Sequence, residues 1–223
     1  EPNGLKIHRD GRIFLADYKN GILVLDPRTG AVEPVMPRRH SERFRGPNDL
    51  VFASNGDLYF TDQGQSGLHD PSGRVFRLTA AGRLELMFAG IPSPNGITLS
   101  PDERTLYVAV TRANAIWRAP LMGDGFVSKV GTFIQMSGGT GPDGIATMDD
   151  GGLAICHVGL GVVWVFDPLG QPLHRVDTCA GRATTNLAFG GPGRRTMFIT
   201  ESDSGQILRA TLPGAGRMMY GEG

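Results

Sequence analysis

The sequence predicts an all-β protein, and more narrowly a β-propeller of four-stranded blades. Three observations lead to this prediction. A polar residue at a tight corner returns roughly every 45 residues, a period typical of propeller blades. Each unit carries short apolar runs separated by turn residues, and no unit shows a helical apolar period. The repeated corner residues are Asn3, Asn48, Asn95, Asp143 and Asn186.

The first strand of each unit is expected directly after the corner residue. Leu50–Phe52 and Ile97–Leu99 are examples of these short apolar strands. A turn follows, at Asn55-Gly56 in the second unit and at Asp150-Gly151 in the fourth. Asn-Gly and Asp-Gly pairs readily adopt the positive φ that tight hairpins need, so a second strand is expected to fold back here.

The remaining strands of each unit differ in polarity. The second strand holds the densest apolar run, as in Leu58–Thr61 and Leu106–Ala109, which suits a strand buried on both faces. The third strand follows a polar loop, as at Val163–Phe166. The fourth is more polar, as at Arg83–Phe88, which is typical of an edge strand facing solvent. The chain therefore shows about five units of four strands.

Composition narrows the class of partner. The net charge of +0 at pH 7 gives no reason to expect a nucleic-acid partner. No apolar run is long enough for a membrane-spanning helix, so no membrane partner is expected. Cys156 and Cys179 are the two cysteines, too few for a disulfide framework, which favours a reducing, cytoplasmic location. Nothing in the sequence fixes the oligomeric state.

The corner residues are the candidates for chemistry. In a propeller the first strand of every blade lines the central channel, so these side chains are expected to converge at its mouth. All five offer oxygen acceptors, and no cluster of His and Cys accompanies them. Oxygen-only convergence suits a hard divalent cation, above all Ca²⁺, which takes ~6–8 oxygen ligands. The alternative is that these Asn and Asp residues cap strands and satisfy turn backbone groups.

Other catalytic arrangements are poorly supported. His157 follows the second strand of the fourth unit and is a candidate lid or proton-transfer residue, with a structural histidine as the alternative. The Gly-rich stretch 138–141 lacks the Lys of a P-loop and is interpreted as a flexible approach to Asp143. The sequence contains no G-x-S-x-G nucleophile elbow.

At the corner residues the chain resembles the senescence marker protein/gluconolactonase/luciferin-regenerating enzyme-like family of six-bladed propeller lactonases. The similarity spans nearly the whole chain in the family's order. The motifs that carry it are Ser93-Pro94-Asn95-Gly96-Ile97, Pro47-Asn48-Asp49-Leu50, Gly56-Asp57-Leu58-Tyr59, Pro142-Asp143-Gly144-Ile145 and Asn186-Leu187-Ala188.

The resemblance implies a metal-dependent lactonase with Ca²⁺, or Zn²⁺ or another divalent metal, in the channel. It assigns Asn95 and Asp143 as metal ligands, with Asp143 also as the general base and Asn48 in contact with substrate or bound water. The family's remaining ligand is a first-blade Glu, for which this sequence shows no match. Residues 1–223 are therefore expected to form a single β-propeller domain that lacks its N-terminal first blade.

The resulting hypothesis is hydrolysis of a small lactone. The metal is expected to polarise the carbonyl while Asp143 activates the attacking water. Two alternatives stay open: a metal-dependent hydrolase of other esters or phosphotriesters, and a non-catalytic propeller that binds a partner. A strictosidine-synthase-like enzyme is disfavoured, because no suitable Glu occupies a corner position.

Overall fold

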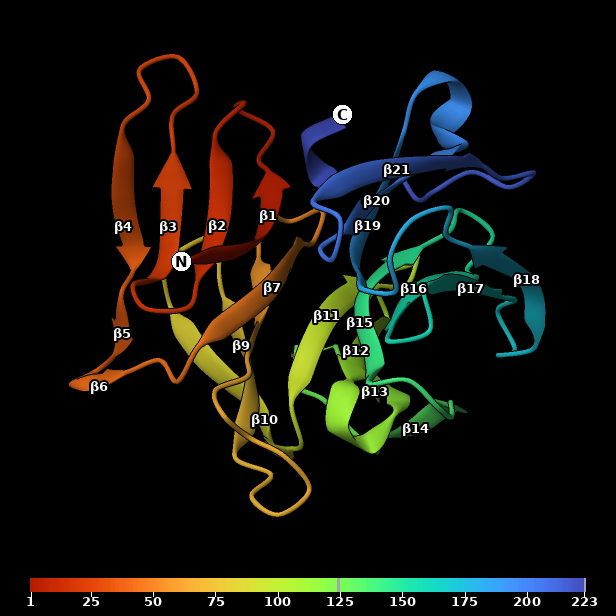
Figure 1. Cartoon of the computed structure of the whole chain (residues 1–223). Helices are drawn as coiled ribbons and strands as arrows, with labels where there is room; N and C mark the ends of the chain where they lie inside the picture. The colour runs from red at the N-terminus through yellow and green to blue at the C-terminus, as the bar shows by residue number, and fades with distance from the viewer. Residues whose placement is uncertain (124, 223) are drawn as a thin grey trace. The chain divides into compact units, whose positions relative to one another are not determined.

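The computed structural model describes residues 1–123 and 125–222. Its regular structure is almost entirely β, arranged as four four-stranded sheets, one three-stranded sheet and one two-stranded ribbon (Figure 1). Within each larger sheet the strands follow one another in chain order and pair as antiparallel neighbours. This up-and-down order is the blade plan of a propeller, and it confirms the predicted fold class.

The strands of the first three sheets follow one another along the chain. The first sheet contains β1 (Pro2–Ile7), β2 (Ile13–Asp17), β3 (Gly21–Leu25) and β4 (Val32–Met36). A ribbon of β5 (Arg38–Arg39) and β6 (Glu42–Arg43) follows. The second sheet contains β7 (Pro47–Phe52), β8 (Leu58–Asp62), β9 (Gly73–Leu78) and β10 (Leu84–Ile91). The third contains β11 (Pro94–Leu99), β12 (Thr105–Val110), β13 (Ala115–Pro120) and β14 (Gly131–Gln135).

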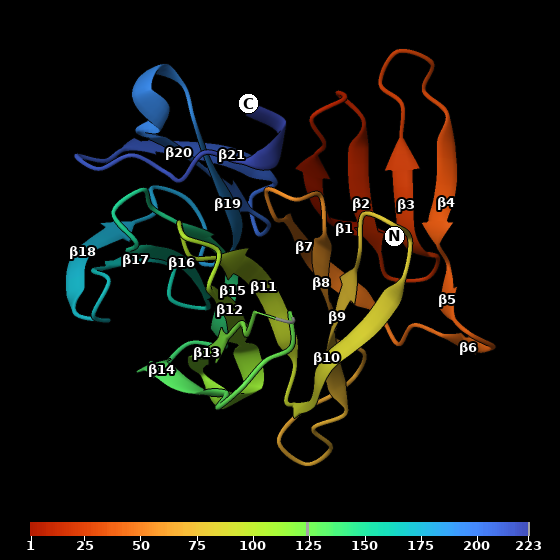
Figure 2. The ribbon, with the colours of Figure 1, turned by 180° about the vertical axis from the view of Figure 1, so that it is seen from behind.

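The last two sheets and three short 3₁₀ turns complete the described chain. The fourth sheet contains β15 (Gly141–Thr147), β16 (Leu153–Val158), β17 (Val162–Phe166) and β18 (Pro172–Asp177). The fifth contains β19 (Thr184–Gly190), β20 (Thr196–Glu201) and β21 (Gln206–Thr211). The 3₁₀ turns are η1 (Thr111–Ala113), η2 (Pro192–Arg194) and η3 (Tyr220–Glu222). Figure 2 shows the sheets from behind, with β8 between β7 and β9.

Turn chemistry and burial explain why these segments become strands. Gly56 and Gly151 adopt φ of 88° and 93° in the hairpins that follow β7 and β15, as the Asn-Gly and Asp-Gly pairs predict. The second strand β8 is buried along its whole length, whereas the outer strand β18 is mostly exposed. The apolar runs therefore mark the strands that pack on both faces.

The chain divides into two compact units, each with its own core. The first unit comprises Glu1–Ile97 with Met219–Gly223, and the second comprises Thr98–Met218. In the first unit, the rings of Phe60 and Phe76 stack with centroids 5.5 Å apart. The second unit has two clusters of buried apolar residues, one around Ile155 and one around Ile199.

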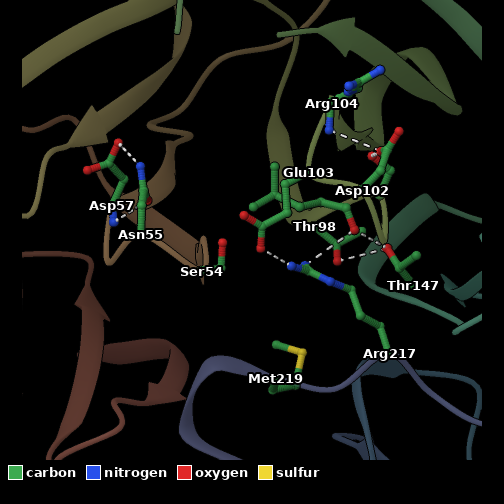
Figure 3. A network of polar contacts seen from close by, with 12 residues as sticks. Ser54, Asn55, Asp57, Thr98, Asp102, Glu103, Arg104, Thr147, Arg217 and Met219 are labelled. Carbon is green, nitrogen blue, oxygen red and sulfur yellow. Dashed lines mark hydrogen bonds and ion pairs between the residues drawn. The ribbon is translucent and has the colours of Figure 1, made fainter. Parts of the chain in front are cut away.

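A polar network ties the last segment of the second unit to its strands. The Arg217 guanidinium pairs with Glu103 (Figure 3). The Arg217 backbone N–H donates to Thr147 O at 2.9 Å. Beside this pair the hydroxyls of Thr98 and Thr147 lie 3.0 Å apart. Burial lowers the pKa of Arg217, and the Glu103 carboxylate opposes this effect. The segment is thus held by both charge and backbone contacts.

Within residues 1–123 and 125–222, no helix has the length and apolar character needed to cross a membrane.

Candidate functional site

The predicted corner residues lie within the first strand of their sheets. Asn48 is the second residue of β7, and the register of β7 on β8 changes between Pro47 and Leu50. The same irregularity occurs in β15 between Pro142 and Ile145, on either side of Asp143. The first strands β1, β7, β15 and β19 thus each carry a register irregularity of the β-bulge kind at the corner, and bulges of this kind re-aim side chains. The strands begin one or two residues before the corner, rather than after it as the sequence predicted.

The register corrects the assignment of Asn186. In β19 the irregularity falls between Thr184 and Asn186, so Thr185 occupies the place of Asn48. Asn186 instead takes the next position: its Oδ1 accepts from the N–H of Leu187 at 2.8 Å. The prediction that Asn186 is a fifth corner residue is therefore wrong, because the bulge rather than the amino-acid type sets the register.

Asn48 is buried, with 6% of its surface exposed. Its amide nitrogen Nδ2 donates to Oε1 of Gln63 at 2.8 Å, and Nε2 of Gln63 donates to the hydroxyl of Ser93 at 2.6 Å. Within the described residues, no side-chain hydrogen bond involves Oδ1 of Asn48. The side chain thus has one of its two amide N–H donors bound and its acceptor oxygen available for a ligand.

Asn95 is the second residue of β11 and belongs to the same unit as Asn48. The hydroxyl of Thr61 accepts from Asp49 N at 3.1 Å and donates to Asn95 O at 2.7 Å. One buried hydroxyl therefore connects the two corners. Asn95 is 7% exposed, and its side-chain amide makes no hydrogen bond to the described residues. Such an amide is suited to receive an external ligand.

Asp143 belongs to the second unit, where it is the third residue of β15 and is half-buried. The strand is fixed just before it, because the Thr111 hydroxyl donates to Pro142 O at 2.7 Å. Gly141 adopts φ of 128°, and a Cβ there would lie 2.2 Å from Thr111 O. Burial raises the pKa of Cys156 well above its usual value, and the negative charge of Asp143 raises it further.

His157 has a structural setting. It is 1% exposed, and its Nε2 donates to Gly138 O at 2.9 Å, while Asn114 Nδ2 donates to the same carbonyl at 2.8 Å. Burial lowers the pKa of His157. The histidine thus anchors the glycine-rich stretch that precedes Asp143, and the contacts favour the structural alternative over a lid.

Asp49 was missed as a site-forming residue. It is 1% exposed, and its Oδ1 accepts from Leu50 N at 2.8 Å. Burial raises the pKa of this carboxyl, although the Lys6 ammonium, 3.7 Å from Oδ1, opposes the effect. The sequence does carry a signal for it: Asp49 stands at the repeat position where the other units have Gly4, Gly96 and Gly144.

Taken one at a time, Asn95 and Asp143 have the chemistry of hard-cation ligands. Asn95 offers an amide oxygen and Asp143 a carboxylate, and hard cations prefer such oxygen ligands. In the part of the chain that the structure describes, no group of three His, Cys, Asp or Glu residues gathers as a metal cluster would. One of the two candidate ligands, Asn95, is a neutral amide, and Ca²⁺ sites in proteins often include such ligands.

These features define a class and then a family. Repeated up-and-down sheets with bulged first strands make the protein a β-propeller. Residues 1–203 match the family described as the SMP-30/Gluconolactonase/LRE-like region, and the chain belongs to this family.

Two curated relatives carry lactonase names. The chain is 35% identical over 219 residues to a gluconolactonase of Zymomonas mobilis, covering 90% of this chain and 60% of that protein. It is 31% identical over 222 residues to lactonase drp35 of Staphylococcus haemolyticus, covering 95% of this chain and 61% of the relative. The chain thus spans about three fifths of the length of these relatives.

A solved structure extends the comparison. The calcium-binding protein regucalcin of Agrobacterium tumefaciens has a TM-score of 0.83 and 25% identity. The similarity covers 98% of this chain and 78% of that one.

Proposed function

We propose that this protein hydrolyses a small lactone of the sugar type with the help of a divalent cation. The observation that supports this most strongly is the recurrence of one position. Asn48, Asn95 and Asp143 each directly follow a proline near the start of the first strand of consecutive sheets. Family membership and 35% identity to a gluconolactonase add the reaction class.

In this proposal Asn95 and Asp143 are ligands of the cation, with Ca²⁺ as the preferred metal. A bound cation supplies Lewis-acid polarisation of the lactone carbonyl. The calcium-binding neighbour supports Ca²⁺, and Zn²⁺ or another divalent metal is the alternative. Asn95 is suited to the task because no described residue accepts or donates a hydrogen bond at its side chain.

The chain's own groups supply positioning and proton transfer. The Asn48 Oδ1 atom accepts a hydrogen bond from a substrate hydroxyl or from the attacking water, since its Nδ2 is already bound to Gln63. Asp143 accepts the proton of that water as the new carbon–oxygen bond forms, and it returns the proton to the ring oxygen as the ester bond breaks. The product is the open hydroxy acid.

A substrate panel tests the proposal. Hydrolysis of D-glucono-δ-lactone, p-nitrophenyl acetate and a phosphotriester is measured with Ca²⁺ and with EDTA. We expect the lactone to be the best substrate and EDTA to remove most turnover. Preference for the acetate or phosphotriester would favour a hydrolase of other esters, and no turnover of any substrate would favour a binding module.

A matched pair of variants tests the role of Asp143. Asp143→Asn should lower kcat by about 100-fold or more, the range that general-base catalysis contributes. Asp177→Asn removes the same charge from the exposed outer strand β18 and should leave kcat unchanged. Equal turnover in both variants would contradict the assignment of Asp143.

A further inference from the structure

Gln63 joins the two candidate corners of the first unit through its side chain. Its Oε1 accepts from Asn48 Nδ2 at 2.8 Å, and its Nε2 donates to the Ser93 hydroxyl at 2.6 Å. Ser93 stands two residues before Asn95. The half-buried glutamine follows β8 directly and therefore spans the second sheet and the start of β11.

Both backbone polar groups of Gln63, its N–H and its carbonyl, are hydrogen-bonded. Its N–H donates to Gly46 O at 2.9 Å, just before the strand that carries Asn48. Its carbonyl accepts from the Ser66 hydroxyl at 2.5 Å, which in turn accepts from Ser93 N at 3.0 Å. With both groups fixed, the side chain has little freedom to turn away from Asn48.

Ser93 shows how strongly this network constrains the chain. It is 3% exposed and adopts φ of 64°, a left-handed conformation that a residue with a Cβ rarely takes. Its N–H and its hydroxyl are both bound, to Ser66 and to Gln63. The network thus holds the backbone in a sparsely populated conformation next to Asn95.

A side-chain amide has one donor end and one acceptor end. With Nδ2 of Asn48 bound to Gln63, the opposite end of the amide is an acceptor. An acceptor selects ligands that bring an O–H group. It gives no attraction to a lactone whose ring carbons bear only hydrogen, because such a ring has no donor.

We propose that Gln63 is a positioning residue that fixes the polarity of the Asn48 amide, so that the site prefers lactones carrying a free hydroxyl. This inference rests on the proposed function and adds a basis for substrate selection within it. The opposite arrangement turns both amides over, so that Oδ1 of Asn48 faces Gln63 and Nδ2 faces the substrate. The two arrangements predict different behaviour when Gln63 is replaced.

Substitutions at Gln63 separate these arrangements. Glutamate only accepts hydrogen bonds, so Gln63→Glu keeps Nδ2 of Asn48 in place, while Gln63→Leu removes the contact. The readout is the ratio of kcat/KM for D-glucono-δ-lactone to that for δ-valerolactone, which lacks hydroxyl groups. We expect Gln63→Leu to lower this ratio about three- to tenfold, the usual effect of one hydrogen bond. The Gln63→Glu variant should keep the wild-type ratio.

Two further variants show whether Gln63 acts through Asn48. In an Asn48→Ala background, Gln63→Leu should change the ratio no further, because the group that it positions is gone. Gln65→Leu is the matched control, since this exposed glutamine contacts Tyr18 instead. If Gln63→Glu lowered the ratio of the two kcat/KM values as much as Gln63→Leu does, the proposed polarity of the Asn48 amide would be overturned.

A spectroscopic measurement decides the contact without any catalysis. The side-chain amide resonances of Asn48 are assigned by their absence in Asn48→Ala. Their chemical shifts should indicate a hydrogen-bonded amide in the wild type and in Gln63→Glu, and they should change in Gln63→Leu. Unchanged resonances in Gln63→Leu would overturn the proposal even if lactones are hydrolysed. Conversely, a wild type that shows the expected resonances but hydrolyses neither lactone would refute the proposed function and leave the amide polarity confirmed.

Discussion

The ion pair between Asp62 and Arg74 should be the costliest charge pair to break in the first unit. Both residues are buried, at 0% and 5% exposure. Nε and Nη2 of Arg74 donate to Oδ2 of Asp62 at 2.9 and 2.6 Å. Oδ1 of Asp62 accepts from Gly46 N at 2.8 Å, so the carboxylate also fixes the backbone ahead of Asn48.

Asp62→Asn removes the buried charge that Arg74 pairs with, and among the described residues Glu42, at 3.0 Å, is then the carboxylate that remains beside the guanidinium. Removing one member of a buried pair costs about 3–5 kcal/mol, and the remaining Glu42 contact places this case near 3 kcal/mol. For a protein of this size that loss lowers the melting temperature by about 6–12 °C.

Thermal unfolding followed by far-UV circular dichroism measures this change, and hydrogen exchange assigns it to a unit. Both tryptophans, Trp117 and Trp164, lie in the second unit, so their fluorescence reports on that unit and not directly on the first. The double variant Asp62→Asn/Arg74→Met removes the uncompensated charge and should be more stable than Asp62→Asn alone. A double variant that is less stable than this single variant would refute the reasoning.

Three further predictions concern the second unit. Hydrogen bonds, that from Ser204 foremost, lower the pKa of Glu201 from 4.5 to about 2. The ionised carboxylate therefore contributes its full stabilisation above pH 4.5 and loses it as the pH falls toward 2. In Glu201→Gln, the loss of stability over this pH range should be smaller than in the wild type. Gly144→Ala places a Cβ 2.6 Å from Asn186 Cα, and a cost of about 1–3 kcal/mol is expected in urea unfolding; an unchanged midpoint would contradict this. Iodoacetamide should label the exposed Cys179 rapidly and the buried Cys156 only after unfolding, as peptide mass spectrometry would show.

The fold was predictable because its signals are local. Asn-Gly or Asp-Gly pairs mark the first hairpin of three units, as at Asn55-Gly56, and apolar runs such as Leu58–Thr61 recur in every unit. Neither signal needs knowledge of distant contacts. The same use of local sequence gave a wrong prediction at Asn186, because the local pattern assigns the asparagine in that stretch to the corner of the fifth unit. The register of β19 on β20 moved that asparagine one position along, and only strand pairing fixes such a shift.

The candidate site was predictable only in part. Asn48, Asn95 and Asp143 stand out because each follows a proline at the same place in its unit. Gln63 gave no such signal, since its importance depends on hydrogen bonds to residues 15 and 30 positions away. The local sequence around a residue does not record partners at that separation, so only the folded structure identifies the residues that support a site.

Calcium titration by isothermal calorimetry tests the central claim most directly. The wild type should bind Ca²⁺ with a Kd of about 10⁻⁶–10⁻³ M, the range of moderate and weak protein sites. Asp143→Asn and Asn95→Ala should each weaken binding at least about tenfold, because the first removes the negative charge of a ligand and the second removes an oxygen ligand. Asp177→Asn should bind as the wild type does. Wild-type protein that binds no calcium, or that binds it equally well without Asp143 and Asn95, would contradict the account.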